Sequence, residues 1–183
     1  MRKFFASIHH HTLLKIIKNY ISDPNTLVLL YKIIGSFNTG QKNTGLPLGN
    51  LTSQLFANVY LDQFDQFMKH QLKVEYYIRY ADDFVVLSQS QSYLENILPS
   101  IHEFLEDKLK LTIHPNKIFI RTIASGVDFL GWVHFPDHRV LRTTTKRRMF
   151  KRLRETNKPE VVRSYMGLLG HGNAYKLKTR IFG

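Results

Sequence analysis

Two short runs of β-forming residues, joined by three small or acidic residues, constrain the fold of this chain more than any other feature of its sequence. Tyr76–Tyr80 and Phe84–Val86 are rich in aromatic and β-branched side chains, which favour strands. The connection, Ala81–Asp83, is too short for parallel strands, which need a crossover of about a dozen residues or more. The pattern therefore predicts an antiparallel hairpin between residues 74 and 88, with two carboxylates at its tip.

Segments with helical periodicity lie on both sides of the hairpin. Apolar residues recur at helical spacing before Asp23-Pro24-Asn25, which interrupts the pattern, and a second helix is expected over residues 26–34. A longer helix is expected to begin near Asn50, which is a candidate cap together with Thr52, and an amphipathic helix is expected over residues 93–109. Short strands are expected over 111–113 and 118–123, and a second hairpin from 127–135 and 139–141. We expect an α+β fold.

An excess of positive charge indicates a polyanionic partner. The chain has 26 Lys and Arg residues against 14 Asp and Glu, a formal net charge of +12, and nucleic acid is the first candidate. A solvated basic surface is the alternative. Hydrophobic residues make up 43% and aromatic residues 13%, which excludes a disordered basic tail. The lack of cysteine excludes a disulfide scaffold and cysteine-ligated metal sites, and no apolar run approaches the roughly 18 residues of a membrane span. We expect a cytoplasmic location.

The adjacent carboxylates of Asp82 and Asp83 have two explanations. Aspartate is a common turn residue, and a solvated pair at a hairpin tip needs no function. Two carboxylates held close together repel each other unless a cation lies between them, and Mg²⁺ takes oxygen ligands while it keeps positions open for water and phosphate. Aromatic and β-branched residues flank the tip on both sides, which favours a partly enclosed cation site.

The motif around these aspartates resembles the metal-binding YxDD box of reverse transcriptases. It reads YIRYADDFVVLS, with Tyr80–Asp83 as the box. Other segments resemble further parts of that family in the same order: the nucleotide-binding loop and following helix in GLPLGNLTSQLFANVYLDQFD (Gly45–Asp65), the lysine-bearing motif around Lys117, the primer-grip hairpin in GVDFLGW (Gly126–Trp132) and the bacterial thumb in SYMGLLGHGNAYKL (Ser164–Leu177). Together they span nearly the whole chain, and the combination is similar to a bacterial reverse transcriptase, an RNA-directed DNA polymerase.

The nucleotide loop narrows the resemblance to one group of these enzymes. Most reverse transcriptases carry QG followed by SP in this loop, whereas this chain has Leu48-Gly49 and Ser53-Gln54. An aliphatic residue before the glycine, with SQ after it, resembles the reverse transcriptases of diversity-generating retroelements. In that group the loop is associated with error-prone copying of template adenines.

The resemblance implies roles for individual residues. Asp82 and Asp83 would bind two Mg²⁺ ions, or Mn²⁺ in their place, and Lys117 would protonate or neutralise the leaving pyrophosphate. The expected nucleotide site contains Phe5, Leu48, Gly49, Gln54 and Tyr80. The expected primer grip contains Phe129, Leu130, Gly131 and Trp132. Contacts to the nucleic-acid backbone are expected from Arg79, Lys146, Arg147, Arg148, Lys151 and Arg152.

Most of these assignments have a structural alternative. Lys117 would otherwise be a surface lysine, Gln54 a polar residue at a helix start, and Phe5 a core residue. The primer-grip residues would be core strand residues, an explanation that is compatible with the first. Arg79 would pair with a carboxylate, and the basic cluster after Thr143 would be a solvated helix face.

The first residues resemble a family pattern that begins before residue 1. The family supplies a third catalytic Asp from a pattern similar to D-I-R-K-F-F-x-S-I-D, and Met1 takes its Ile position. We therefore expect a palm and thumb portion without the first catalytic Asp, the fingers and one palm strand. Asp62 and Asp65 are not expected to replace that Asp, because they lie about three turns along the long helix. Residues 9–11, three histidines, are not expected to form a metal site, because consecutive side chains diverge.

The resemblance implies a partial palm domain over residues 1–143, an antiparallel sheet with helices packed on one face, and a small basic helical thumb over residues 144–183. The expected function is extension of a DNA primer on an RNA template from deoxynucleoside triphosphates, with an accessory protein of the retroelement as a further partner and no membrane partner. The alternative is a catalytically inactive reverse transcriptase remnant that binds nucleic acid.

Overall fold

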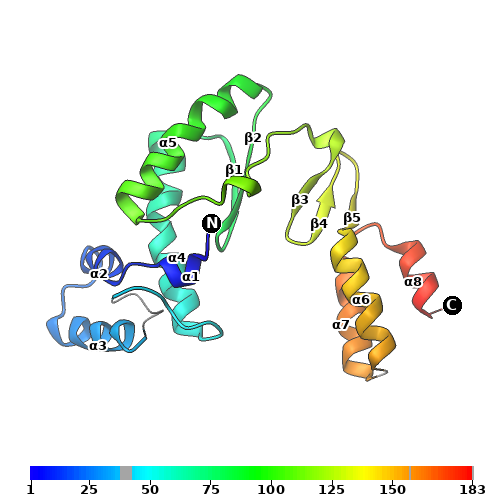
Figure 1. Cartoon of the computed structure of the whole chain (residues 1–183), viewed down its shortest axis with the longest axis horizontal. Helices are drawn as coiled ribbons and strands as arrows, with labels where there is room; N and C mark the ends of the chain where they lie inside the picture. Colours follow the sequence, from blue (N-terminus) through cyan, green and yellow to red (C-terminus); the bar gives the residue numbers. More distant parts are fainter. Residues whose placement is uncertain (38–42, 157, 183) are drawn as a thin grey trace. The chain divides into compact units, whose positions relative to one another are not determined.

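The chain divides into two compact units, Met1–Ile120 and Arg121–Gly183 (Figure 1). The structure is a computed structural model that describes residues 1–37, 43–156 and 158–182. Each unit has its own hydrophobic core. The units divide after Ile120 because the strands that follow Arg121 share a core with the C-terminal helices, and the expected palm and thumb boundary between residues 143 and 144 stays a prediction.

The first unit begins with helices α1 (Phe4–Ser7), α2 (His10–Lys18) and α3 (Pro24–Gly35). Asp23 caps α3, since its carboxylate accepts a hydrogen bond from the Thr26 backbone N–H at 2.7 Å. Pro24 occupies the first turn, where a missing N–H costs nothing. The predicted interruption at residues 23–25 is therefore a helix start.

Two longer helices carry the core of this unit. Helix α4 (Leu51–Gln66) continues into a short π-helix, η1 (Phe67–Gln71), and α5 is Gln91–Leu109. The apolar stripe of α4, which consists of Phe56, Tyr60 and Phe64, is buried, with Tyr60 and Phe64 fully inaccessible. Asn50 occupies the cap position of α4 without a side-chain capping hydrogen bond.

The predicted hairpin forms from β1 (Tyr76–Tyr80) and β2 (Asp83–Leu87), which pair antiparallel. Phe64 of α4 makes edge-to-face contacts with Tyr77 and Phe84, at ring-centroid distances of 6.0 and 5.1 Å. Phe104 of α5 lies beside the same Phe64 ring. Helices α4 and α5 therefore cover one face of the hairpin, as an antiparallel sheet with helices on one face requires (Figure 1).

Tyr60 holds α4 to the end of α5, and its loss is expected to destabilise the first unit. Its hydroxyl donates to the Leu109 carbonyl at 2.6 Å, and burial raises the pKa of Tyr60 to about 12. We expect Tyr60→Phe to lower the free energy of unfolding by about 1–3 kcal/mol, because a buried carbonyl loses its donor. Urea unfolding followed by circular dichroism measures this, with Tyr175→Phe, which changes a 79% exposed tyrosine, as the control. Equal midpoints for both variants would contradict the assignment.

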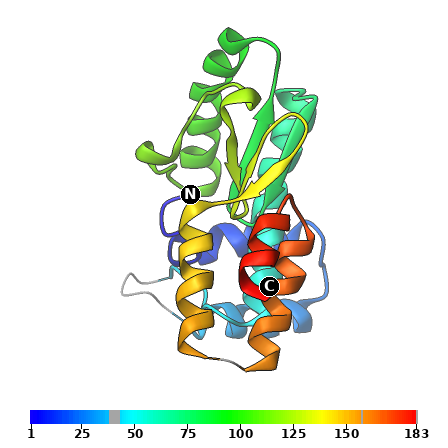
Figure 2. The same cartoon turned by 90° about the vertical axis from the view of Figure 1, so that its right-hand side faces the viewer.

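The second unit joins a three-stranded antiparallel sheet to three helices. The strands β3 (Val127–Phe129), β4 (Trp132–His134) and β5 (Arg139–Leu141) are neighbours in that order. Helices α6 (Thr143–Glu155) and α7 (Pro159–Gly170) run antiparallel, and α8 (Tyr175–Phe182) packs beside α7 (Figure 2). None of the helices in the described residues is long and apolar enough to span a membrane.

The segment 127–135, predicted as one strand, is two strands joined by a tight turn. Phe129 pairs with Trp132, and the two residues between them, Leu130 and Gly131, have φ values of 53° and 83°. Positive φ at both central residues is typical of a type I′ turn, whose twist suits a hairpin. The strand pattern missed this turn because leucine rarely adopts positive φ, whereas the resemblance to the primer-grip hairpin in Gly126–Trp132 implied a hairpin here.

The strands predicted at 111–113 and 118–123 do not form. Leu111 and Ile113 are buried and Thr112 is exposed, so the alternation behind the first prediction is present. The Arg2 N–H donates to the Thr112 carbonyl at 2.9 Å, but this contact does not extend into a ladder. Short 3₁₀ turns, η2 (Pro115–Lys117) and η3 (Ile123–Ser125), occupy this part of the chain instead.

Candidate active site

The two aspartates lie at the tip of the β1–β2 hairpin. Tyr80 pairs with Asp83, so the loop between the strands consists of Ala81 and Asp82 alone. Ala81 has a left-handed backbone, with φ at 50°, which lets the chain reverse direction within two residues. Asp82 is half-buried and Asp83 is exposed. The tip therefore presents two consecutive carboxylates at the point where one strand ends and the next begins.

The face of the hairpin away from α4 and α5 is open. Tyr76, Ile78 and Tyr80 are 58%, 56% and 64% exposed, and they alternate with the inward-facing residues of β1. Tyr80 and Asp83 are cross-strand partners and share this face. Tyr80 is thus an exposed aromatic side chain next to the acidic tip.

A cation already lies against Asp82. The Met1 ammonium is 3.3 Å from Oδ2 of Asp82 and 3.4 Å from its backbone carbonyl oxygen. Asp83 makes no ion pair or side-chain hydrogen bond with any residue that the structure describes. Oxygen donors of this kind fit Mg²⁺ or Mn²⁺. Within the described ranges, no group of three or more His, Asp or Glu side chains is placed to hold a metal.

Arg79 pairs with a carboxylate, which is the alternative that the sequence left open for it. Its guanidinium forms an ion pair with Asp65 of α4. The Tyr77 hydroxyl donates to the same carboxylate at 2.7 Å. Burial and then the hydrogen bond to Asp65 raise the pKa of Tyr77, and the hydrogen bond with Asp65 raises the pKa of Arg79.

Sequence reasoning missed the role of Asp65. It considered this residue only as a replacement metal ligand, whereas the carboxylate is engaged by Arg79 and Tyr77. An available signal was the position of Asp65 directly after the stripe residue Phe64, at the end of the helix that covers the hairpin.

The segment that contains Phe5 is hydrogen-bonded to the start of the predicted nucleotide loop. The Leu46 N–H donates to the Phe5 carbonyl, and the Gly45 N–H to the Ile8 carbonyl, both at 2.8 Å. The buried His10 ring lies 2.7 Å from the Gly45 carbonyl oxygen through Nε2, so this histidine fastens the loop. Phe5 is half-buried, and it packs against the core while it lies beside this loop.

The rest of the predicted nucleotide loop is open to solvent. Leu48 is 79% exposed, and Gln54 is exposed on the first turns of α4. Gly49 has φ at 89°, and a Cβ placed on it would meet no atom within 4 Å. The loop therefore leaves room for another molecule at Gly49. Lys117 is exposed in η2 and forms no ion pair with Asp82 or Asp83.

The predicted primer grip divides into exposed and buried residues. Leu130 is 46% exposed at the turn, and Phe129 and Gly131 are half-buried. Trp132 is only 6% exposed and belongs to the core that β4, β5, α6, α7 and the start of α8 share. The core explanation therefore describes the Trp132 side chain, and the turn residues are the accessible part of the predicted grip.

A family match identifies the chain. Residues 1–134, well over half of the chain, match the family described as reverse transcriptase (RNA-dependent DNA polymerase). The chain belongs to the reverse transcriptase family. Unit 1 and the strands β3 and β4 of this reverse transcriptase lie inside the match, and helices α6–α8 follow it.

Three relatives place this reverse transcriptase among longer proteins. Protein YkfC of Escherichia coli (strain K12) is 27% identical in an alignment 183 residues long. The alignment covers 80% of this chain and 46% of YkfC. The group II intron-encoded protein LtrA of Lactococcus lactis subsp. cremoris is 25% identical, over 80% of this chain and 35% of LtrA. The putative COX1/OXI3 intron 2 protein of Saccharomyces cerevisiae is 23% identical, over 72% of this chain and 23% of that protein.

The chain thus spans less than half the length of these relatives. Two of them are named as intron proteins. Their names do not test the expected likeness to diversity-generating retroelements, which stays a prediction.

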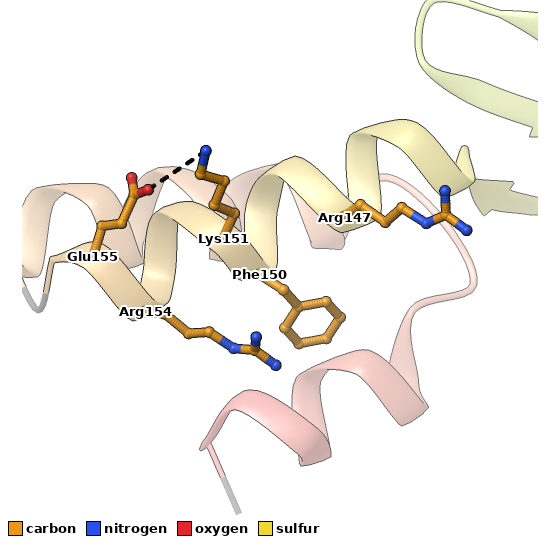
Figure 3. A pocket seen from close by; sticks show the side chains of 5 residues that line it. All are labelled: Arg147, Phe150, Lys151, Arg154 and Glu155. Carbon is orange, nitrogen blue, oxygen red and sulfur yellow. Dashed lines mark ion pairs between the residues drawn. The ribbon is translucent and has the colours of Figure 1, made fainter.

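The basic cluster of this reverse transcriptase lies along α6. Arg147, Arg148, Lys151 and Arg152 are exposed and Lys146 is half-buried. A shallow pocket of about 360 Å³ is lined by α6 residues, which are Arg147, Phe150, Lys151, Arg154 and Glu155 (Figure 3). Phe150 and Arg154 point towards α8, and Lys151 and Glu155 form an ion pair at 3.8 Å. Sequence reasoning did not assign Phe150 to a site.

Proposed function

We propose that this chain carries the polymerase centre of an RNA-directed DNA polymerase, with Asp82 and Asp83 as ligands of divalent metal ions. One observation supports this more than any other: the family's paired carboxylates stand at a two-residue hairpin tip, beside an exposed tyrosine. Mg²⁺ fits this oxygen donor set, and Mn²⁺ would fit it as well. Two ions are expected, as two-metal phosphoryl transfer requires.

In this proposal, different residues of the chain have different roles in nucleotidyl transfer. When bound, the metal ions supply positive charge that stabilises the phosphate oxygens and activates the primer 3′-hydroxyl. Asp82 and Asp83 hold that charge at the hairpin tip. Gly49 lets the backbone approach the incoming nucleotide, and Phe5, beside the same loop, limits the space available to its sugar. Tyr80 offers a flat apolar surface next to the tip.

A finer proposal concerns fidelity and partners. Leu48 and Gln54 are both exposed at the loop where the retroelement group departs from other reverse transcriptases. We propose that these two side chains contact the nucleotide or the template and that copying is error-prone at template adenines. An accessory protein of the retroelement and the role of Lys117 as a proton donor belong to the same proposal.

A second function is a nucleic-acid-binding protein without catalysis. The observation that favours it is the donor set, since no third acidic side chain in the described ranges joins Asp82 and Asp83. Such a protein would still bind RNA–DNA duplex through its basic surface, because backbone binding needs only cations and shape.

Primer extension distinguishes the two functions. The 183-residue chain is incubated with a DNA primer on an RNA template, deoxynucleoside triphosphates and Mg²⁺, beside the Asp82→Asn, Asp83→Asn double variant. If the unaltered chain extends the primer and the double variant does not, the result supports the polymerase function. Duplex binding without extension supports the second function, and neither extension nor binding would contradict both.

The basic row on α6 is expected to set the salt dependence of nucleic-acid binding. Arg147 and Lys151 are exposed one helical turn apart, a spacing that suits neighbouring phosphates. We expect Arg147→Gln and Lys151→Gln each to reduce the slope of log affinity against log salt by about 1. Fluorescence anisotropy of a labelled RNA–DNA duplex between 50 and 300 mM salt (roughly the range in which phosphate contacts are resolved) measures the slope. Lys32→Gln, on exposed α3, is the control, and equal slopes for all variants would contradict a role for α6.

A further inference from the structure

The Asp65 carboxylate accepts three hydrogen bonds from two β1 side chains. Its Oδ1 accepts hydrogen bonds from the Tyr77 hydroxyl and from Nε of Arg79, each at 2.7 Å, and its Oδ2 accepts from Nη2 of Arg79. The Arg79 side chain is 11% exposed and the Asp65 side chain 28%. A bidentate arginine–carboxylate pair with this little exposure holds its geometry better than a solvated ion pair does. This contact therefore fixes one position of β1 against α4.

Arg79 also reaches the hairpin tip. Its remaining terminal nitrogen, Nη1, donates to the Ala81 carbonyl at 2.9 Å. That carbonyl belongs to the peptide plane that ends at the Cα of Asp82, so its orientation sets the direction in which the Asp82 side chain leaves the loop. Ala81 has positive φ, a strained conformation for an alanine, and the Arg79 hydrogen bond offsets part of this strain.

The Asp65–Arg79 ion pair also keeps the Arg79 guanidinium away from the carboxylates of the hairpin tip. Arg79 is three residues from Asp82, and an arginine without a partner would be attracted to the acidic tip. Asp65 binds the guanidinium on the inner face of the hairpin, whereas Asp83 belongs to the outer face. A shift of β1 by one residue would exchange the two faces, and the Asp65–Arg79 contact opposes such a shift.

We propose that Asp65 and Arg79 are positioning residues that hold the Ala81–Asp82 peptide so that Asp82 and Asp83 bind a divalent cation together. Arg79 acts through the backbone of the tip rather than through a nucleic-acid phosphate. The inference rests on the proposed function, because it assumes that the aspartate pair binds metal. It also concerns metal binding alone, which is measured without template, primer or nucleotide.

The test is Mn²⁺ binding by the full 183-residue chain, followed through the electron paramagnetic resonance signal of free Mn²⁺. We expect Arg79→Lys and Asp65→Asn to weaken binding about tenfold or more, the usual effect of losing a group that orients a metal ligand. The lysine keeps a charge for Asp65 but cannot hold Asp65 and the Ala81 carbonyl in the same fork.

Two further variants separate positioning from stability. Tyr77→Phe removes one hydrogen bond to Asp65 and leaves the Arg79–Ala81 contact, so it is expected to lower the unfolding midpoint but to change Mn²⁺ affinity less than twofold. Arg142→Lys alters an exposed Arg–Asp pair in the second unit and is the matched control. Each variant's unfolding midpoint is measured by circular dichroism.

The outcomes are distinct. Weak Mn²⁺ binding by Arg79→Lys and Asp65→Asn, with affinity retained in Tyr77→Phe and Arg142→Lys, supports the proposal. Unchanged affinity in Arg79→Lys, or an equal loss in Tyr77→Phe, would overturn it. Absence of saturable binding by the unaltered chain would also overturn it, since there would be no cation site to position. Saturable binding without primer extension would reject the polymerase function and leave the positioning role intact.

Discussion

Replacing Asp83 by Asn is expected to lower the rate of primer extension at least about a hundredfold. The change keeps the shape of the side chain but replaces a charged oxygen with an N–H donor, which repels a metal ion. Loss of a metal-ion contact to developing phosphate charge removes several kcal/mol of transition-state stabilisation, and about 2.7 kcal/mol corresponds to a factor of 100. Asp83 is exposed and lacks an ion-pair partner among the described residues, so its stability effect is expected to stay within about 0.5 kcal/mol.

Asp82→Asn is expected to lose activity to a similar extent, with one difference. Its carboxylate lies 3.3 Å from the Met1 ammonium, so this variant also loses an ion pair. Steady-state extension rates at saturating nucleotide, with the unfolding midpoint of each variant, separate the two effects. Asp137→Asn, another exposed aspartate in a hairpin connection, is the control. Extension by Asp83→Asn within a factor of three of the unaltered chain would contradict a metal-binding role for this residue.

The hairpin and its acidic tip were predictable because their signals are local. Strand formers on both sides of Ala81 and Asp82 determine an antiparallel pair, and alternation along β1 indicates which residues face the helices. The same reasoning predicted the helix that begins near Asn50, since its apolar stripe recurs every three or four residues. These features depend on neighbours in sequence, so they did not require knowledge of the tertiary contacts.

The partners across the fold were not predictable. Arg79 meets Asp65 only because α4 lies across the hairpin, and no local pattern distinguishes that outcome from a phosphate contact. Leu111 and Ile113 alternate like strand residues, but a strand also needs a neighbouring backbone, which the described chain does not supply there. The sequence left both a grip and a core role open for Trp132, and only its contact with the turn between α7 and α8 shows that the side chain belongs to the core.

The contact between Trp132 and this turn predicts a large effect of substitution at Gly172. An ideal Cβ on Gly172 would lie 2.1 Å from Cζ3 and 2.6 Å from Cη2 of Trp132, so the indole packs directly on this glycine. The guanidinium carbon of Arg139, in β5, lies over the same ring at 5.6 Å from its centroid. Nε of Arg139 also donates to the His171 carbonyl. Because Trp132 is buried and held, it cannot move away without opening the core of the second unit.

Gly172→Ala is therefore expected to lower the free energy of unfolding of the second unit by about 1–3 kcal/mol, the usual cost of an overpacked core. Trp132 is the single tryptophan of the chain, so its fluorescence in a urea titration reports this unit directly. Gly167→Ala is a matched control on α7, where an added Cβ would meet nothing within 4 Å, and it is expected to stabilise by about 0.5–1 kcal/mol through its helix propensity.

A compensating change tests whether the clash itself is the cause. Trp132→Leu makes room for the alanine methyl group, so the cost of Gly172→Ala is expected to fall by more than half in the Trp132→Leu background, as measured by circular dichroism. Additive losses in the double variant, or a Gly172→Ala midpoint equal to that of the unaltered chain, would show that the indole does not require a glycine at this position. The expected coupling would instead show that the residues beside the predicted primer-grip turn are held by the same core as helices α6–α8, so that this turn and the helices of the second unit unfold together.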